Sequence, residues 1–406
     1  MGSAADLLDP DRFAAGPPFE LLDELREGGP AESGHGPTGT RLVSVCSYAD
    51  IESISKDPGT WSSWEGGIFP HPDQVEPLDL ARNLLLYMDP PQHTKYRKIL
   101  QTAFVPNSVS KLEPMIREIV TAVLDEATGS GNSEGGSCDF AADVAVPIPL
   151  RILARLMGLP EEDLPRLEEW VARIEAGQRS TEPEAALDVI TEMAPYLLDQ
   201  ITRQRDEGAE SLVTTLVAAE VDGESLTEIE ILVFFALLVF AGNDTTRNTM
   251  SGGMLALLEH PDQLELLRDE PERIPAAVEE ILRWTSVVNY FCRTAKEDTE
   301  VSGCPVHKGE KVMIWYPAGS RDPEVNDDPQ RFDITRDDAK HMAFGGGGRH
   351  FCLGAGLARL ELRVAFEEIL GRWGDIRLAG EPQRVRSNWA SVLTSLPIQF
   401  KRGQTL

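Results

Sequence analysis

The most specific feature of this sequence is the stretch Phe344-Gly-Gly-Gly-Gly-Arg349-His350-Phe351-Cys352-Leu353-Gly354. Four consecutive glycines allow positive backbone φ angles and a close approach to a flat ligand, a freedom that costs entropy unless something requires it. A helix is predicted to begin just after Cys352. The dipole and the unpaired N–H groups of a helix N-terminus stabilise a thiolate, which suits this cysteine to bind a metal. The alternative is a glycine-rich loop with an incidental buried cysteine.

Composition and charge are those of a soluble globular protein and limit its partners. The 406 residues are 41% hydrophobic and carry a formal net charge of −29. This charge argues against nucleic acid and anionic membranes, which bind clustered cations. The longest apolar run, Ile231–Ala241, has eleven residues, whereas a membrane-spanning helix needs roughly 20. The N-terminal residues lack a signal-peptide pattern, and five scattered cysteines without a CxxC pair fit a reducing compartment, so we expect a cytoplasmic protein.

Hydrophobic periodicity predicts a mainly α-helical chain with a smaller β-rich region. Helices are predicted over His93–Phe104, Val109–Ala127, Ile148–Met157, Leu164–Ala176, Ala185–Arg205, Leu226–Leu258 and Gly356–Leu370. The β-rich parts are expected at about 38–60, 286–318 and 376–402, from β-branched and aromatic runs between turn residues. Thr128–Ser137 is predicted to be an exposed loop. No repeat or long linker divides the chain, which predicts a single domain over residues 1–406.

Four segments, in the same order along the chain, resemble signatures of the cytochrome P450 superfamily. The stretch that contains Cys352 is similar to the heme-binding loop, and Ala241-Gly242-Asn243-Asp244-Thr245-Thr246 resembles the oxygen-activation segment. Glu280-Ile-Leu-Arg283 resembles the ExxR signature, and Pro329-Gln-Arg331-Phe332 the segment that closes its salt-bridge network. The resemblance runs from Asp6 to Phe400 and implies the cytochrome P450 fold, a triangular α+β domain that encloses heme b.

The glycine-rich loop departs from the usual pattern at one position. Phe344 lies eight residues before Cys352, whereas the usual loop has phenylalanine seven residues before the cysteine; Gly345 takes that position here. A bacterial subgroup with the pattern FGGGGxHFCLG shares the extra glycine. The departure therefore indicates a subgroup and leaves heme binding intact.

The resemblance implies which residues hold the cofactor. Cys352 is the expected metal ligand, because an electron-rich sulfur favours cleavage of the O–O bond. Buried heme propionates need cations nearby, and the matching residues are His93, Arg97, Arg293 and His350. Further cofactor contacts are expected from Ala241, Phe344, Gly345 and Gly354.

The oxygen-activation segment lies in a long helix, predicted to begin at a Ser225-Leu-Thr-Glu228 capping box and to end at His260-Pro261. A bond from the Thr245 hydroxyl to the i−4 carbonyl, near Gly242, is expected to open this helix locally and leave a groove for dioxygen. Asp244 and Thr245 then form an acid–alcohol pair that relays protons. The alternative is a buried aspartate that only caps a neighbour.

Two further charged groups have predicted roles. Glu280 and Arg283 share a helix face and are expected to pair with Arg331 in a buried scaffold network.

The resemblance implies a ferredoxin with its reductase, or a flavodoxin, as electron donor, and a local concentration of positive charge would steer such an acidic partner. Its residues are Lys95, Arg97, Lys98, Arg349, Arg359 and Arg363. The alternative is a solvated basic face.

The substrate pocket is inferred from the family's substrate-contact regions. Its expected residues are Phe234, Leu237, Leu238, Ala241, Val287, Val288, Asn289, Tyr290, Val392 and Leu393. Only Asn289 and Tyr290 offer hydrogen bonds, so a hydrophobic substrate is expected. The loop Trp61–Leu86 is predicted to be a mobile lid, with a rigid surface loop as the alternative.

Together these features predict a monooxygenase that uses O2 to hydroxylate a hydrophobic small molecule. The segments AGNDTTRN and FGGGGxHFCLG are similar to those of bacterial members that hydroxylate steroids, methyl-branched lipids and terpenoids. Two alternatives stay open: a hydroxylase acting on amino acids bound to a carrier protein, and a heme-thiolate protein that binds a ligand without oxidising it. Peroxide-driven chemistry is a third. The Asp244-Thr245 pair favours the enzyme, because a ligand binder needs no proton delivery.

Overall fold

The computed structural model describes residues 2–36, 39–70, 81–129, 135–179 and 184–402. Its helices are α1 Phe19–Gly28, α2 Tyr48–Lys56, α4 Gln92–Gln101, α5 Pro106–Val109, α6 Glu113–Thr128, α7 Pro147–Leu156, α8 Leu164–Arg179, α9 Glu184–Glu207, α10 Leu212–Val217, α11 Glu228–Glu259, α12 Pro261–Asp269, α13 Ile274–Thr285, α14 Tyr316–Ser320 and α15 Ala355–Arg372. Its strands are β1 Ala31–His35, β2 Arg41–Val45, β3 Trp61–Ser62, β4 Gly135–Asp139, β5 Glu220–Val221, β6 Glu224–Ser225, β7 Tyr290–Ala295, β8 Thr299–Val301, β9 Cys304–Val306, β10 Lys311–Trp315, β11 Trp373–Leu378, β12 Gln383–Arg384, β13 Leu393–Ser395 and β14 Pro397–Arg402.

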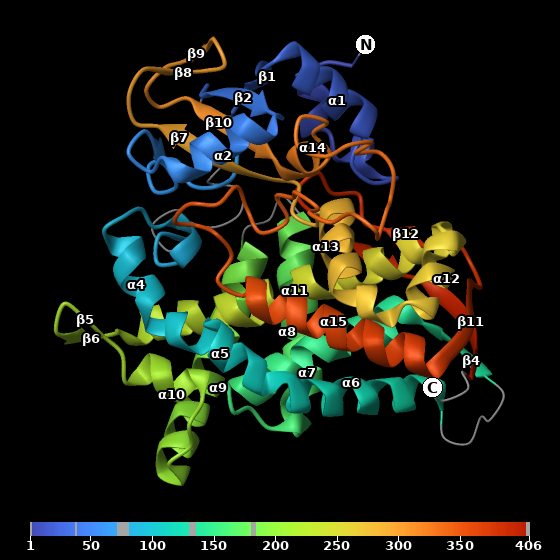
Figure 1. The fold of residues 1–406 in the computed structure, drawn as a ribbon. Helices are drawn as coiled ribbons and strands as arrows, with labels where there is room; N and C mark the ends of the chain where they lie inside the picture. The colour runs from blue at the N-terminus through green and yellow to red at the C-terminus, as the bar shows by residue number, and fades with distance from the viewer. Residues whose placement is uncertain (1, 37–38, 71–80, 130–134, 180–183, 403–406) are drawn as a thin grey trace.

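The main sheet and the long helices occupy two different regions (Figure 1). A β-rich region at the top of the view contains the N-terminus, α1 and α2, while the long helices form the larger lower region. α11 lies centrally in that helical region and contacts α7, α9, α13 and α15. The prediction of a mainly α protein with a smaller β region is therefore confirmed.

The main sheet has five strands in the order β1-β2-β10-β7-β3. β10 pairs parallel to β2 and antiparallel to β7, with Met313 opposite Cys292 and Val312 opposite Arg293. Because side chains alternate along a strand, one face of the sheet carries Tyr290 and Cys292 and the other carries Phe291 and Arg293. The first face packs against the N-terminal residues and the second faces α2.

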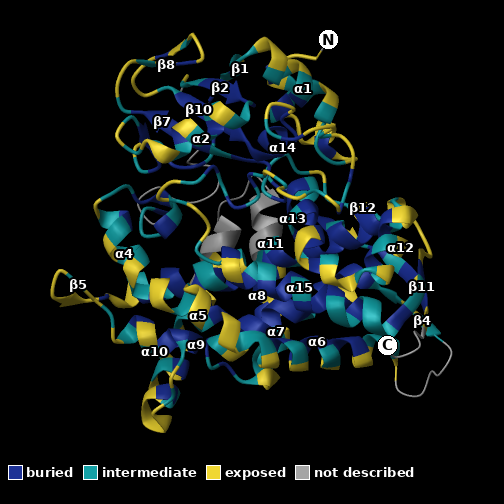
Figure 2. Ribbon diagram, viewed as in Figure 1, coloured by how far each residue is buried: buried dark blue, intermediate teal, exposed yellow. Residues whose placement is uncertain are grey.

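Helix α11 is the core element of the helical region. It spans 32 residues, or about 48 Å at 1.5 Å per residue. By length and composition it is the one described helix that would suit a membrane span, but half of its most apolar window is buried inside the fold, as a core helix requires. Buried side chains concentrate along α11 and the helices around it (Figure 2).

Most predicted elements are confirmed, and the corrections concern their ends. α11 begins two residues later than expected, since the capping box is formed by Thr227 and Glu230 and not by Ser225 and Glu228. The expected loop 128–137 ends in β4, which gains backbone partners from β14. The region 38–60 contains α2 besides β2. Residues 130–134, at the centre of the expected loop 128–137, and residues 71–80 of the predicted lid lie outside the described residues.

Candidate functional site

The glycine-rich loop is folded back on itself just before α15. The Cys352 N–H donates to the Phe344 carbonyl at 3.0 Å, and the Gly345 N–H donates to the Met342 carbonyl at 2.9 Å. Gly345, Gly347 and Gly348 have φ angles of 87°, 86° and 70°, in the left-handed region that favours glycine. The loop therefore needs glycine at these positions for its backbone shape alone.

Close packing against α2 accounts for two of the glycines. A Cβ atom on Gly346 would lie 2.4 Å from the Ser55 Oγ, and one on Gly348 would lie 2.1 Å from the Ser55 carbonyl oxygen. These approaches exclude any side chain unless α2 moves. The sequence predicted that the glycines serve approach to a flat ligand, but at these two positions the close neighbour is α2.

The environment of the Cys352 thiol contains opposing influences. Desolvation by the surrounding protein raises the pKa of Cys352, while hydrogen bonds from the backbone of Gly354 and Ala355 and the charges of Arg97 and Arg359 lower it. Ala355 is the first residue of α15, so the helix N-terminus does face the sulfur. Cys352 as a whole residue is nevertheless exposed. These groups favour a sulfur that carries negative charge once a cation is bound to it.

Five basic side chains lie close enough to influence one another near the cysteine: His93, Arg97, Arg293, Arg349 and His350. The rings of His93 and His350 lie 4.3 Å apart. Desolvation, helped by Arg97 and Arg349, lowers the pKa of His93 to about 4, and desolvation with Arg293 and His93 lowers that of His350. The His93 Nδ1 atom is buried with no hydrogen-bond partner among the described residues. Arg97 and Arg293 donate to backbone carbonyls, at Phe351 and Cys292, and not to carboxylates.

This donor set fits a heme. Arg293 is buried and Arg97 half-buried, and neither has an acidic partner among the described residues, so the two call for an anionic ligand, which the two propionates supply. The described part of the chain holds no group of three His, Cys, Asp or Glu residues able to bind a metal ion by themselves. A single thiolate therefore suits a metal whose other ligands come from a cofactor. His93, Arg97, Arg293 and His350 would hold the propionates, and Cys352 the iron.

A family model for cytochrome P450 matches residues 178–402, and relatives match nearly the whole chain. The chain belongs to the cytochrome P450 family. It is 34% identical over 410 residues to steroid C26-monooxygenase of Rhodococcus jostii, covering 98% of this chain and 84% of that protein. It is 34% identical to methyl-branched lipid omega-hydroxylase of Mycobacterium bovis, covering 88% and 83%.

Solved structures agree with the sequence relatives. A Mycobacterium marinum cytochrome P450, CYP268A2, in complex with pseudoionone, has a TM-score of 0.87 and 33% identity, with 96% of each chain covered. The fold is therefore the cytochrome P450 fold. As a member of this family the protein is a monooxygenase with a heme cofactor, a cysteine thiolate ligand and O2 as co-substrate.

In this cytochrome P450 the oxygen-activation segment stays within a continuous helix. The Thr245 hydroxyl donates to the Ala241 carbonyl at 2.9 Å, which confirms the expected i−4 bond. The expected local opening is absent, since α11 is helical from Glu228 to Glu259. Asp244 is buried, and its Oδ1 accepts from the Arg247 Nη2 and the Asn248 Nδ2, both at 2.9 Å. The aspartate thus also has the neighbour-capping contacts of the alternative.

The buried scaffold network differs from the expected one in its third member. Arg283 donates to both oxygens of Glu280, at 2.6 and 2.7 Å, and both residues are fully buried. The second arginine on Glu280 is Arg336, with its Nε 3.4 Å from Oε2. Arg331 was expected there, but its side chain is 60% exposed and only its carbonyl oxygen joins, accepting from Arg283 and Arg336.

The expected polar residues of the substrate pocket have other partners. The Tyr290 ring packs on Trp315 at 4.8 Å, on the sheet face that meets the N-terminal residues. Asn289 is fully buried; its Nδ2 donates to the Asn388 carbonyl and its Oδ1 accepts from the Ser391 hydroxyl. Neither residue lies where the prediction placed it, as a hydrogen-bonding group in the pocket.

The expected apolar pocket residues lie within the hydrophobic core or at its edge. Phe234 is buried and stacks on Tyr96 at 6.1 Å, with Leu237 and Leu238 at the edge of the same helical core. Leu393 belongs to the large core cluster, and its N–H donates to the Asn248 Oδ1. Val287 and Val288 are joined through the backbone to Ser391 and Ala390, next to Val392.

Four aromatic side chains that the sequence analysis missed form a cluster beside these residues. Phe240 stacks on Trp389 at 6.2 Å, Phe69 meets Trp389 edge-on at 5.9 Å, and Phe69 meets Phe291 at 6.4 Å. We call these four residues the aromatic box. Alternation along β7 was the available signal, because Phe291 shares the face of Arg293.

The predicted docking cations differ in how far their charge is balanced. Lys95 pairs with Asp222, Arg359 with Glu279, and Arg363 with Glu113. Lys98 and Arg349 are exposed, and neither has an acidic partner within ion-pair distance in the described part of the chain. Phe351, next to Arg349, is 39% exposed.

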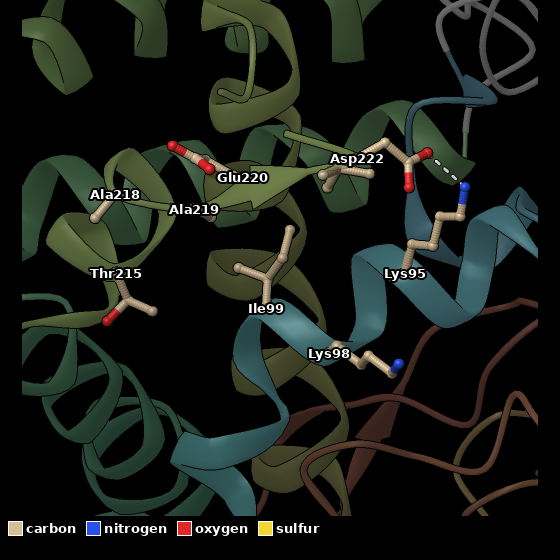
Figure 3. A pocket seen from close by; sticks show the side chains of 9 residues that line it. Lys95, Lys98, Ile99, Thr215, Ala218, Ala219, Glu220 and Asp222 are labelled. Carbon is tan, nitrogen blue, oxygen red and sulfur yellow. Dashed lines mark hydrogen bonds and ion pairs between the residues drawn. The ribbon is translucent and has the colours of Figure 1, made fainter. Parts of the chain in front are cut away.

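A surface pocket of about 630 Å³ lies between α4, α10 and the β5–β6 hairpin (Figure 3). Lys95 and Lys98 line it, and the Lys95 ammonium reaches Asp222 across its edge (Figure 3). Cys352 does not line it. This pocket is therefore separate from the candidate heme site, and exposed lysines alone do not define a ligand for it.

Proposed function

We propose that this cytochrome P450 hydroxylates a hydrophobic small molecule of the steroid, terpenoid or methyl-branched lipid class. The observation that carries the proposal is the aromatic box, which places four large apolar side chains between the oxygen-activation segment and Arg293. Such a lining suits an extended apolar molecule. The resemblance to relatives that carry the names steroid C26-monooxygenase and methyl-branched lipid omega-hydroxylase supports the same class.

The roles of the site residues form part of this proposal. Cys352 is the thiolate ligand, and His93, Arg97, Arg293 and His350 bind the propionates. Ala241, Phe344, Gly345 and Gly354 contact the cofactor. The bound heme supplies the activation of O2. The remaining chemistry belongs to the chain: it excludes water, holds the substrate and delivers protons.

Proton delivery falls to Asp244 and Thr245. The Thr245 hydroxyl has to leave the Ala241 carbonyl to donate its proton, and the Asp244 carboxylate has to exchange its contacts with Arg247 and Asn248 for the next proton donor. Both exchanges need only side-chain rotation, because the helix backbone is intact around them. A positioned acid–alcohol pair contributes to rate when it meets the proton acceptor in the transition state.

Electrons come from a ferredoxin and its reductase, or from a flavodoxin, docking around Lys98 and Arg349. The exposed Phe351 ring beside Arg349 offers an apolar contact with charged surroundings, an arrangement typical of protein interfaces. We further propose that residues 1–406 form one domain, supported by contacts of α11 with helices from both halves of the chain, and that the protein acts in the cytoplasm.

The test begins with the purified, heme-loaded enzyme. A strongly red-shifted Soret band of the reduced, carbon monoxide-bound form is expected from a thiolate ligand. Titration with testosterone, pseudoionone and a methyl-branched fatty acid should then give a type I spectral shift with at least one of them, and turnover with ferredoxin and reductase should give a hydroxylated product. A shift only with an aminoacyl-carrier protein would support the carrier-bound alternative, and a shift without product the non-catalytic binder.

A further inference from the structure

Trp389 carries a hydrogen-bond donor that the fold does not use. Its indole Nε1 is buried, and no acceptor lies within hydrogen-bond distance in the described residues. Buried donors in native proteins nearly always have a partner, because leaving one unpaired forfeits its hydrogen bonds to water without replacement. An unused donor at a functional site therefore calls for an acceptor that the protein itself does not provide.

The backbone around Trp389 is fixed from two sides. The Trp389 carbonyl accepts from the Asn289 N–H at 2.8 Å, and the Trp389 N–H donates to the Ser387 hydroxyl at 3.2 Å. Asn388, next to it, donates to the Leu7 carbonyl and accepts from the Asn289 side chain. The indole is thus held in place before any ligand arrives, which lowers the entropic cost of a hydrogen bond to it.

The rings around Trp389 place this donor beside the candidate heme site. Phe240, stacked on the indole at an interplanar angle of 18°, directly precedes Ala241, whose carbonyl accepts from Thr245. Phe69 connects the indole to Phe291, which shares a sheet face with Arg293. The donor therefore lies in an apolar wall, between the segment expected to handle oxygen and a residue expected to hold the cofactor.

We propose that the Trp389 indole N–H binds an oxygen acceptor, a ketone or a hydroxyl, on an otherwise apolar substrate. Trp389 is then a specificity-determining residue: anchoring the oxygen at one end of the molecule selects which distant carbon faces the reacting centre. With Asn289 and Tyr290 committed elsewhere, it is the unpaired donor that the box presents. The inference rests on the proposed function and narrows it to oxygen-bearing substrates.

The test combines one substitution with matched probes on the holoenzyme. Trp389→Phe keeps an aromatic ring and removes the donor together with part of the ring surface that packs on Phe69 and Phe240. The probes are androst-4-en-3-one and androst-4-ene, which differ in the carbonyl oxygen, together with pseudoionone and its hydrocarbon analogue without the carbonyl. Dissociation constants are measured by calorimetry. Wild type should bind the ketone of a pair about 3- to 10-fold more tightly than the hydrocarbon, the difference expected for one neutral hydrogen bond, and Trp389→Phe should abolish that preference.

Stability provides a second measurement. Because the donor is unpaired in the free enzyme, Trp389→Phe loses packing but no hydrogen bond, so it should lower the thermal midpoint by no more than the matched change Trp170→Phe does. Trp170→Phe, in the helical core against Tyr196, is the control and should leave the ketone preference intact. Equal affinity for ketone and hydrocarbon in the wild type would overturn this inference alone. Failure of all four probes to bind would refute the proposed substrate class and, with it, the inference.

Discussion

At the scale of single residues, the oxygen-activation segment shows what one hydroxyl can do. Thr245 and Thr249 make the same bond to the carbonyl four residues earlier, each at 2.9 Å. The effect of these bonds on the helix is therefore the same at both positions, and only their place differs. Thr245 lies beside Asp244, and Thr249 lies one turn further along α11.

This pair allows the proton-relay assignment to be tested against a matched control. Thr245→Ala should lower the yield of hydroxylated product per electron consumed by about 5-fold or more, since a positioned proton donor is lost. Thr249→Ala removes an equivalent hydroxyl and should leave the coupling near the wild-type value. The measurement is product formed against NADPH consumed, with hydrogen peroxide determined in parallel. Unchanged coupling in Thr245→Ala would show that the relay assignment is wrong.

At the scale of elements, the ExxR network joins α13 to the segment that leads to the cysteine loop. Glu280 accepts from Arg283 and Arg336, and from the Asp333 N–H at 2.8 Å. A buried carboxylate that loses a cationic partner is strongly destabilising, because the charge stays in a medium of low dielectric. The network therefore supports both α13 and the loop segment that follows it.

Substitutions of the two arginines of this segment, Arg331 and Arg336, are expected to differ in their effect on stability. Arg336→Ala should lower the free energy of unfolding by about 3 kcal/mol and weaken heme retention, because it uncovers the Glu280 charge. Arg331→Ala, at an exposed side chain, should change it by no more than about 0.5 kcal/mol. Urea unfolding of the holoenzyme, followed by fluorescence and by the Soret band, measures both. A larger loss of stability in Arg331→Ala than in Arg336→Ala would show that the Arg331 side chain belongs to the network.

The same elements show how much of the structure could be predicted from the sequence. Periodicity predicted the long helices, because a buried helix face imposes its own spacing on the apolar residues. Periodicity could not predict whether Arg331 or Arg336 pairs with Glu280, since the segment is irregular and both residues are polar. Strand alternation was enough to predict that Tyr290 and Arg293 lie on opposite faces of the sheet. Which of the two faces meets the N-terminal residues is set by tertiary packing. Trp389 lies far along the chain from Phe69 and Phe240, so tertiary packing alone brings them together.

At the scale of the whole molecule, a net charge of −29 leaves little positive surface. Ion pairs balance Lys95, Arg359 and Arg363, while Lys98 on α4 and Arg349 in the cysteine loop remain exposed. An acidic electron donor would therefore be guided to a small area. Most of the remaining surface repels such a partner, which helps to orient the encounter.

Charge reversal tests this docking area. Lys98→Glu should lower the second-order rate of reduction by ferredoxin about 3- to 10-fold at low ionic strength, and the loss should shrink as salt screens the attraction. Lys308→Glu, exposed in the turn between β9 and β10, makes the same change in net charge and should have little effect. Stopped-flow reduction of enzyme with equal heme content gives the rates. Equal losses in both variants would mean that only net charge matters.

The packing of Gly346 and Gly348 against α2 also sets an order of events during synthesis. α2 is completed early, whereas the loop that covers Ser55 follows it only after most of the other helices and strands. At typical rates of translation that interval lasts on the order of tens of seconds. During this time the face of α2 that packs against the glycine-rich loop lacks this contact. The contact between the glycine-rich loop and α2 is consequently made late in synthesis, and a chain cut short before Gly346 leaves this contact unmade.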